Sequence, residues 1–189
     1  MSRRVLGRNA LPAAVLERDA RAVRVRLEAN VEFPGDLPTA LQAGAEGIGL
    51  YRSEFLLTNG LEDADEDRQF EVYRGMLAGM APAPVTVRTF DIDEEQLARR
   101  VADGPLDPES PLSEGRHGRE GLRGLRLGLM RPDLLQGQLR ALLRAARYGS
   151  LRILFPFVSS VEQVRRARTI LADTGAELEH SVVADQLGP

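Results

Sequence analysis

Short apolar runs alternate with segments of helical spacing along most of this chain. Strands are predicted at residues 23–31, 47–50, 85–90 and 151–158, and helices at residues 37–45, 63–80, 122–130, 132–148 and from 159 to about 171. Strands separated by helices are typical of parallel sheets, whose crossover connections are right-handed. The sequence therefore predicts an α/β fold with four βα units, either an open doubly wound sheet or part of a barrel.

An arginine lies at or near the end of two of these strands. Arg52 follows the small and apolar run at residues 44–51, and Arg88 lies in the alternating strand at residues 84–90. Ligands of parallel α/β folds bind at the carboxyl ends of the strands. A planar guanidinium suits a phosphate or carboxylate group better than an ammonium does. The two arginines therefore predict an anion site, although a surface arginine at a strand end is the simpler alternative.

Composition excludes several classes of chemistry. All 25 basic residues are arginine, and the 189-residue chain has neither lysine nor cysteine. A Schiff-base lysine, a P-loop lysine and a cysteine nucleophile are thus absent. The net charge of −3 argues against a nucleic-acid partner. With no apolar run of about 18 residues, we expect no membrane span, and with no secretory h-region we expect a cytoplasmic protein.

Several motifs resemble one known family. Residues 44–57 are similar to that family's signature "GAEGIGLYRTEFL", and residues 87–92 match its strand "VRTFDI". Residues 121–126 resemble "LGLRAIR", and residues 151–158 resemble "LRIMFPMV". In this order, the motifs resemble the C-terminal barrel of the phosphoenolpyruvate (PEP)-utilising enzymes, and most closely that of the enzyme I family of the bacterial phosphotransferase system. The similarity runs from about residue 25 to residue 171.

The resemblance implies a partial TIM-type (β/α) barrel, of which this chain supplies the first half. Residues 1–22 would be a helical lead-in or linker, residues 23–175 the half-barrel, and residues 176–189 a tail in which residues 181–184 could form a short strand. The Gly- and Pro-containing polar segment at residues 93–120 would be a functional loop or a surface excursion.

Carried over position by position, the resemblance makes Arg52 and Arg88 the pair that binds the phosphate of PEP. Glu54 and Asp91 would be carboxylates that hold the guanidinium planes in place. Arg123 is a weaker candidate for the same rim. From the residues alone, Arg123 and Arg126 are interpreted as one solvated face of a short helix.

The family's metal-ligating carboxylates, acid/base cysteine and phosphohistidine domain have no counterpart in these motifs. The resemblance thus implies Mg²⁺ as a cofactor of the complete enzyme, with no ligands for it and no catalytic residue in this chain, which alone should be inactive. It also implies a histidine-containing phosphocarrier protein as partner. Two alternatives remain open: a non-catalytic half-barrel that serves in interaction or regulation, and a lyase- or aldolase-type barrel. Unpaired strand edges also leave a homodimer open.

Overall fold

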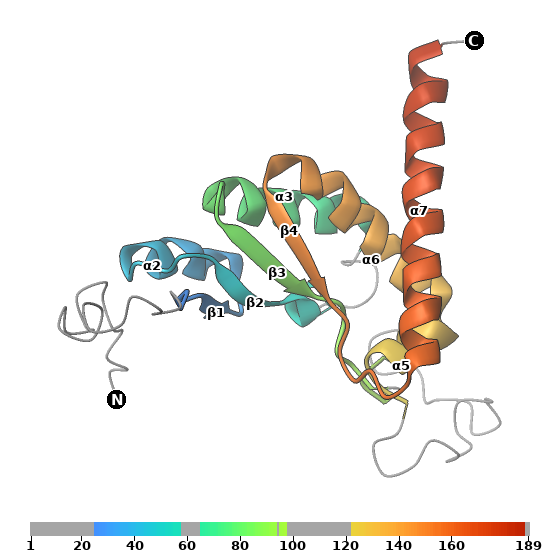
Figure 1. The fold of residues 1–189 in the computed structure, drawn as a ribbon, viewed down its shortest axis with the longest axis horizontal. Coiled ribbons are helices and arrows are strands. Elements are labelled where there is room, and N and C mark those ends of the chain that lie inside the picture. The colour runs from blue at the N-terminus through green and yellow to red at the C-terminus, as the bar shows by residue number, and fades with distance from the viewer. Residues whose placement is uncertain (1–24, 58–64, 94, 98–121, 188–189) are drawn as a thin grey trace, which may run out of the picture.

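The computed structural model describes residues 25–57, 65–93, 95–97 and 122–187. Its strands β1 (Ala29–Val31), β2 (Ile48–Arg52), β3 (Pro84–Arg88) and β4 (Ser150–Leu154) form one parallel sheet in the order β1-β2-β3-β4 (Figure 1). The predicted α/β class, with four parallel strands in sequential order, is confirmed. A doubly wound sheet reverses its strand order at a switch point, so the unbroken order is that of a barrel segment.

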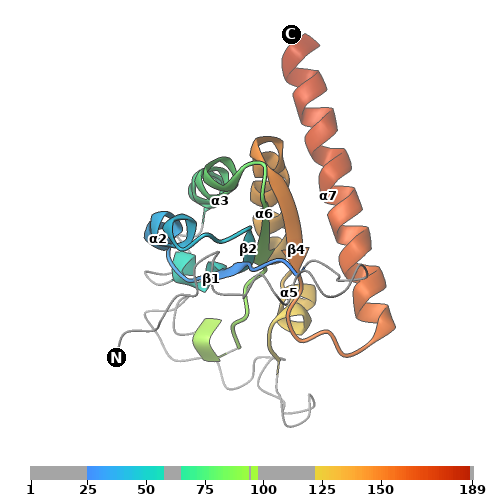
Figure 2. The same cartoon turned by 60° about the vertical axis from the view of Figure 1, so that its left-hand side comes forward.

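Helices cover one face of this sheet. The helices of the described ranges are α2 (Leu37–Gln42), α3 (Glu66–Met80), α5 (Leu125–Met130), α6 (Pro132–Ala145) and α7 (Val161–Leu187), with short 3₁₀ turns η1 (Pro34–Asp36), η2 (Ser53–Leu57) and η4 (Ala146–Tyr148). Of these, α5 lies beyond the carboxyl ends of the strands, and α7 packs on α5 and α6. Along the row, α2 contacts α3, α3 contacts α6, and α6 contacts α7. Figures 1 and 2 show α2, α3 and α6 together on one side of the strands.

The hydrophobic core lies between the sheet and this row of helices. Ile48 and Tyr51 of β2 and Val85 and Val87 of β3 are completely buried on that side. They meet an apolar set from α3 and α6 that consists of Tyr73, Met76, Leu77, Leu139 and Leu142. The opposite face is polar: there Arg152 of β4 donates to both carboxylate oxygens of Glu28 at 2.7 Å. Because side chains alternate between the faces of a strand, the core decides which residues point to the open side.

The elements begin where their sequences supply caps. Asp65 accepts a hydrogen bond from the backbone N–H of Arg68 at the start of α3, and Pro132 occupies the first turn of α6. At α7 the cap is one residue later than predicted, because Ser160, not Ser159, accepts from the backbone N–H of Gln163. No helix in the described ranges combines the length and the apolar character that crossing a bilayer requires.

Both outer strands differ from the prediction. In β1 only Ala29–Val31 pair, and the preceding Val25 and Leu27 are exposed. The prediction that residues 151–158 form a strand buried on both faces is wrong: β4 ends at Leu154, and on its open face Ser150, Arg152 and Leu154 are exposed. Within the described ranges β4 also has a neighbour on the β3 side alone. Alternation and apolar content describe a strand's composition, but not its position in the sheet.

The C-terminal segment is also different. The prediction that its helix ends near residue 171, with a strand or tail after it, is wrong, because α7 continues to Leu187 and its C-terminal half projects from the sheet in both views (Figures 1 and 2). Gly175 lies inside the helix, where one glycine costs only about 1 kcal/mol. The domain boundary after residue 175 stays a prediction. The lead-in at residues 1–22 and most of the polar segment at residues 93–120 lie outside the described residues.

A close backbone approach gives the first testable prediction. A Cβ atom at Gly149, just before β4, would lie 2.6 Å from the carbonyl oxygen of Leu77 in α3. We expect Gly149→Ala to destabilise the fold by about 1–3 kcal/mol, because the helix and the strand must move apart. Urea unfolding measures the change.

Gly137→Ala is the matched control. A Cβ at Gly137 in α6 meets no atom within 4 Å, so this change should stabilise the helix by about 0.5–1 kcal/mol. A Gly149→Ala variant as stable as the parent would contradict the close approach of Leu77.

Candidate anion site

Arg52 and Arg88 end adjacent parallel strands and are register partners. The preceding pair in the same register, Tyr51 and Val87, points into the core. Because side chains alternate, both arginines point to the open face at the carboxyl edge of the sheet. The structure thus brings the two predicted arginines together. Whether they share one phosphate stays a prediction.

Two carboxylates hold Arg88. Its Nε and Nη2 atoms lie 3.2 and 3.0 Å from Oε1 of Glu54, and its Nη1 atom lies 3.1 Å from Oδ2 of Asp91. The same Glu54 oxygen accepts the backbone N–H of Asp91 at 2.9 Å. A guanidinium has five N–H donors. These contacts engage Arg88 on two sides, and the N–H groups that they leave over can serve an anion.

Asp91 extends this chain of charges to Arg123. The Nε and Nη2 atoms of Arg123 donate to Oδ1 and Oδ2 of Asp91 at 2.8 and 3.3 Å. This hydrogen bond raises the pKa of Arg123, so the group remains a cation. The Arg123 guanidinium also lies 4.7 Å from the ring centroid of Phe157. Charges thus alternate in the order Glu54, Arg88, Asp91, Arg123.

Arg123 does not lie on a helix. It pairs with Asp93 in an isolated bridge before α5, and Gly124, with φ of 56°, starts that helix. A Cβ at Gly124 would be 3.1 Å from the carbonyl oxygen of Pro156. The interpretation of Arg123 as part of a solvated helical face is therefore wrong. Its place beside Asp91 agrees with the alternative, a position on the rim of the site.

Arg52 differs from the other two arginines. It is exposed, and within the described ranges its side chain makes no hydrogen bond and no ion pair. Arg88 and Arg123 are oriented by carboxylates, whereas Arg52 meets no carboxylate in the part of the chain that the structure describes. The site therefore combines fixed donors with one cation that is available to an incoming anion.

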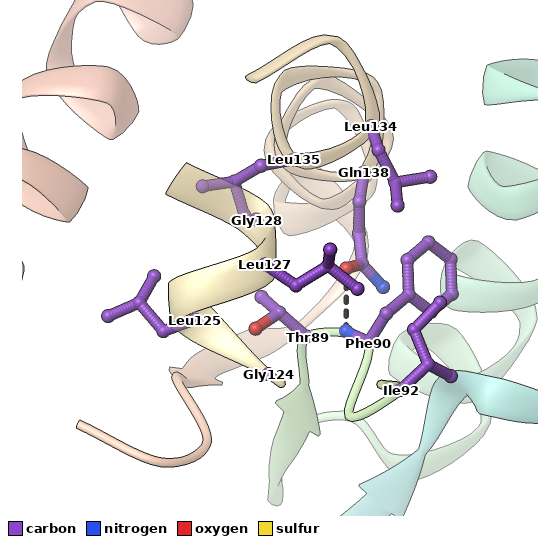
Figure 3. A pocket seen from close by; sticks show the side chains of 10 residues that line it. All are labelled: Thr89, Phe90, Ile92, Gly124, Leu125, Leu127, Gly128, Leu134, Leu135 and Gln138. Atoms are coloured by element: carbon purple, nitrogen blue, oxygen red, sulfur yellow. Dashed lines mark hydrogen bonds between the residues drawn. The ribbon is translucent and has the colours of Figure 1, made fainter. Parts of the chain in front are cut away.

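A set of buried polar side chains that was not predicted from the sequence lies behind these strand ends. Ser53, Gln69, Tyr73 and Gln138 are completely or almost completely buried and linked by hydrogen bonds. Figure 3 shows Gln138 beside an apolar pocket between α5 and α6, with its side-chain oxygen accepting the backbone N–H of Phe90. The sequence contains one sign of this buried cluster: Gln138 is a polar residue within the leucine stripe of α6.

The site does not fit a resident metal ion. Among the residues that the structure describes, no group of three or more histidine, aspartate or glutamate side chains could hold a cation. The carboxylates at the site, Glu54 and Asp91, are engaged by guanidinium groups. Their arrangement serves to orient arginine, not to coordinate Mg²⁺.

Four parallel strands in sequential order, two of which carry arginines at their carboxyl ends, define an α/β barrel segment. Residues 10–187 match the family described as "PEP-utilising enzyme, PEP-binding domain". The chain belongs to this family, which confirms the predicted resemblance.

Three similar proteins share one name. The chain is 44% identical over 150 residues to the phosphoenolpyruvate-protein phosphotransferase of Latilactobacillus sakei, covering 79% of this chain and 25% of the relative. It is 38% identical over 177 residues to that of Staphylococcus carnosus (90% and 29%) and 39% identical over 166 residues to that of Geobacillus stearothermophilus (87% and 27%). The chain thus spans between a quarter and three tenths of the length of these relatives.

The position of Asp91 between two arginines yields a stability prediction. Its side chain is only 5% exposed and contacts both Arg88 and Arg123. Asp91→Asn removes the charge that both guanidinium groups face, so we expect a loss of about 1.5–3 kcal/mol in the free energy of unfolding. Chemical denaturation at neutral pH measures it.

Asp133→Asn is the matched control, since Asp133 pairs with Arg131 but is 63% exposed. There we expect a loss below about 1 kcal/mol. If both variants lost the same free energy of unfolding, the burial of Asp91 would add nothing to the stability that its ion pairs provide.

Proposed function

We propose that this chain is the PEP-binding part of a phosphoenolpyruvate–protein phosphotransferase, in which Arg52 and Arg88 bind the phosphate group of PEP. The observation that carries the proposal is the register pairing of these two arginines at the carboxyl edge of the sheet. Family membership and the shared name of the relatives support the same substrate. They do not favour the alternative of a non-catalytic interaction or regulatory half-barrel, nor that of a lyase or aldolase.

The geometry suits a phosphoryl group. Glu54 and Asp91 hold the Arg88 guanidinium before the ligand arrives, so its remaining N–H groups need no reorganisation to meet phosphate oxygens. Arg52 supplies a second cation from the neighbouring strand, and it has no ion-pair partner among the described residues. Phosphoryl transfer is catalysed mainly by positioning and by neutralising the charge on the transferring group. We assign the binding and part of this neutralisation to Arg52 and Arg88, and a place on the rim to Arg123.

The complete enzyme is proposed to use Mg²⁺ and to pass the phosphoryl group to a histidine-containing phosphocarrier protein in the cytoplasm. Ligands for the ion would come from outside the described residues, as would the catalytic residues. In that complete enzyme, Arg52 and Arg88 would bind PEP, and the histidine that accepts the phosphoryl group would lie outside the described residues.

Arginine removal tests the proposal in the full-length protein. Arg52→Ala and Arg88→Ala should each lower PEP-dependent phosphotransfer about 100-fold or more, because each deletes a charge-assisted contact to the transferring group. PEP affinity from calorimetry and initial rates from a carrier-phosphorylation assay measure the effect.

Arg166→Ala on the exposed side of α7 is the control, and should retain parental affinity and rate. Parental turnover in both Arg52→Ala and Arg88→Ala, with the fold intact, would refute the proposed roles.

The unpaired edges give a prediction about association. Among the described residues, strand β4 pairs only with β3, and the nearby Phe157 and Val158 are exposed at 39% and 43%. Such edges are commonly covered by pairing. Residues 1–189 expressed alone should therefore form a homodimer at micromolar concentration in sedimentation experiments, whereas a stable, cooperatively unfolding monomer would contradict this expectation.

A further inference from the structure

A buried polar network lies behind the ends of β2 and β3. Ser53 and Tyr73 are 0% exposed, Gln138 is 1% exposed and Gln69 is 2% exposed. Burying such groups costs free energy unless each is hydrogen-bonded. The network therefore constrains geometry strongly, because a shift of one member leaves others without partners.

Gln138 of α6 is the centre of this network. Its Oε1 atom accepts the backbone N–H of Phe90 at 3.0 Å (Figure 3). Its Nε2 atom donates to Oγ of Ser53 at 3.0 Å and to the hydroxyl of Tyr73 at 2.9 Å. The carboxamide thus uses both of its N–H groups and its carbonyl oxygen.

The direction of every hydrogen bond follows from that arrangement. Because Ser53 and Tyr73 accept from Gln138, their own O–H groups are left to donate. Ser53 Oγ donates to the carbonyl oxygen of Arg88 at 2.7 Å, and the Tyr73 hydroxyl donates to Oε1 of Gln69 at 3.1 Å. Burial raises the pKa of Tyr73, which keeps that hydroxyl protonated.

This network contacts the backbone at the proposed phosphate site. Ser53 follows Arg52 directly, and the other anchors are the carbonyl of Arg88 and the N–H of Phe90. Strand β3 ends at Arg88, so the N–H of Phe90 lies beyond the strand, and its acceptor comes from α6 instead. One side chain on an outer helix therefore sets the relative position of both arginine-bearing strand ends.

We propose that Gln138 is a positioning residue for the anion site, which acts through Ser53 and the Arg88–Phe90 backbone to hold Arg52 and Arg88 at the spacing that one phosphate group requires. This inference rests on the proposed function of the two arginines. Gln138 itself is buried, so its proposed role is an indirect one. Small displacements of groups that orient a substrate can cost large factors in binding or rate.

The test measures PEP affinity by calorimetry in the full-length protein. Gln138→Leu removes all three hydrogen bonds of the carboxamide. Ser53→Ala removes the hydrogen bond to the Arg88 carbonyl and the acceptor of one Gln138 N–H group, but it leaves the contacts of Gln138 with Phe90 and Tyr73. We expect about tenfold weaker PEP binding for Gln138→Leu and a smaller loss in the same direction for Ser53→Ala. Should Gln138→Leu fail to fold, Ser53→Ala carries the test. The control is Leu142→Val, which trims a buried side chain of the same helix and should bind PEP within twofold of the parent.

A second comparison separates positioning from general loosening of the fold. Lysine is a flexible point charge and depends less on exact orientation than the planar guanidinium. In an Arg88→Lys background, Gln138→Leu should therefore weaken PEP binding by less than threefold. An equal factor in both backgrounds, an equal loss in Leu142→Val, or parental affinity in both Gln138→Leu and Ser53→Ala would overturn the inference.

Failure of the two proposals is distinguishable. If Arg52→Ala and Arg88→Ala leave PEP affinity unchanged, the proposed function is wrong and the inference falls with it. If the arginine variants lose affinity while Gln138→Leu and Ser53→Ala match the control, only the positioning role is wrong.

Discussion

The register of β2 against β3 is the constraint on which the candidate site depends. Tyr51 and Val87 pair with each other and are completely buried beneath the helices. A slip of one residue would place an arginine in the apolar core and a core residue on the open face. The hydrophobic core therefore aligns Arg52 with Arg88, although neither arginine takes part in it.

The charged groups around this pair have different physical roles. Arg88 and Arg123 share Asp91, and Glu54 holds Arg88 from the other side. Because Asp91 is buried, its contacts contribute to stability, but these ion pairs also orient the two guanidinium groups. For the site their value is geometric, because a guanidinium already fixed by carboxylates presents its free N–H groups in a defined direction. The positive charges of Arg88 and Arg123 are balanced by Glu54 and Asp91. Arg52 has no such partner within the described ranges, so its positive charge is the one that carboxylates there do not balance.

The support for this arrangement comes from the helices behind the sheet. Tyr73 of α3 and Gln138 of α6 reach the strand ends through hydrogen bonds that are shielded from water. An entirely apolar interface would be cheaper to bury. It could not supply an acceptor for the N–H of Phe90, nor hold the carbonyl of Arg88 through Ser53. Polar groups in this core therefore connect its packing to the geometry of the site.

What the sequence by itself determined was the local pattern: alternating strands and helices, the acidic first turn of α3, Pro132 at the start of α6, and arginines at the ends of β2 and β3. Periodicity and capping depend on neighbouring residues, so they can be read from a single chain, and the motifs around Arg52 and Arg88 indicated the family. Only the tertiary structure decided that Asp91 meets Arg123 and that Gln138 meets Ser53, because these contacts join residues 32 and 85 positions apart. The exposure of β4 and the continuation of α7 past Gly175 also depend on neighbours that no local pattern specifies.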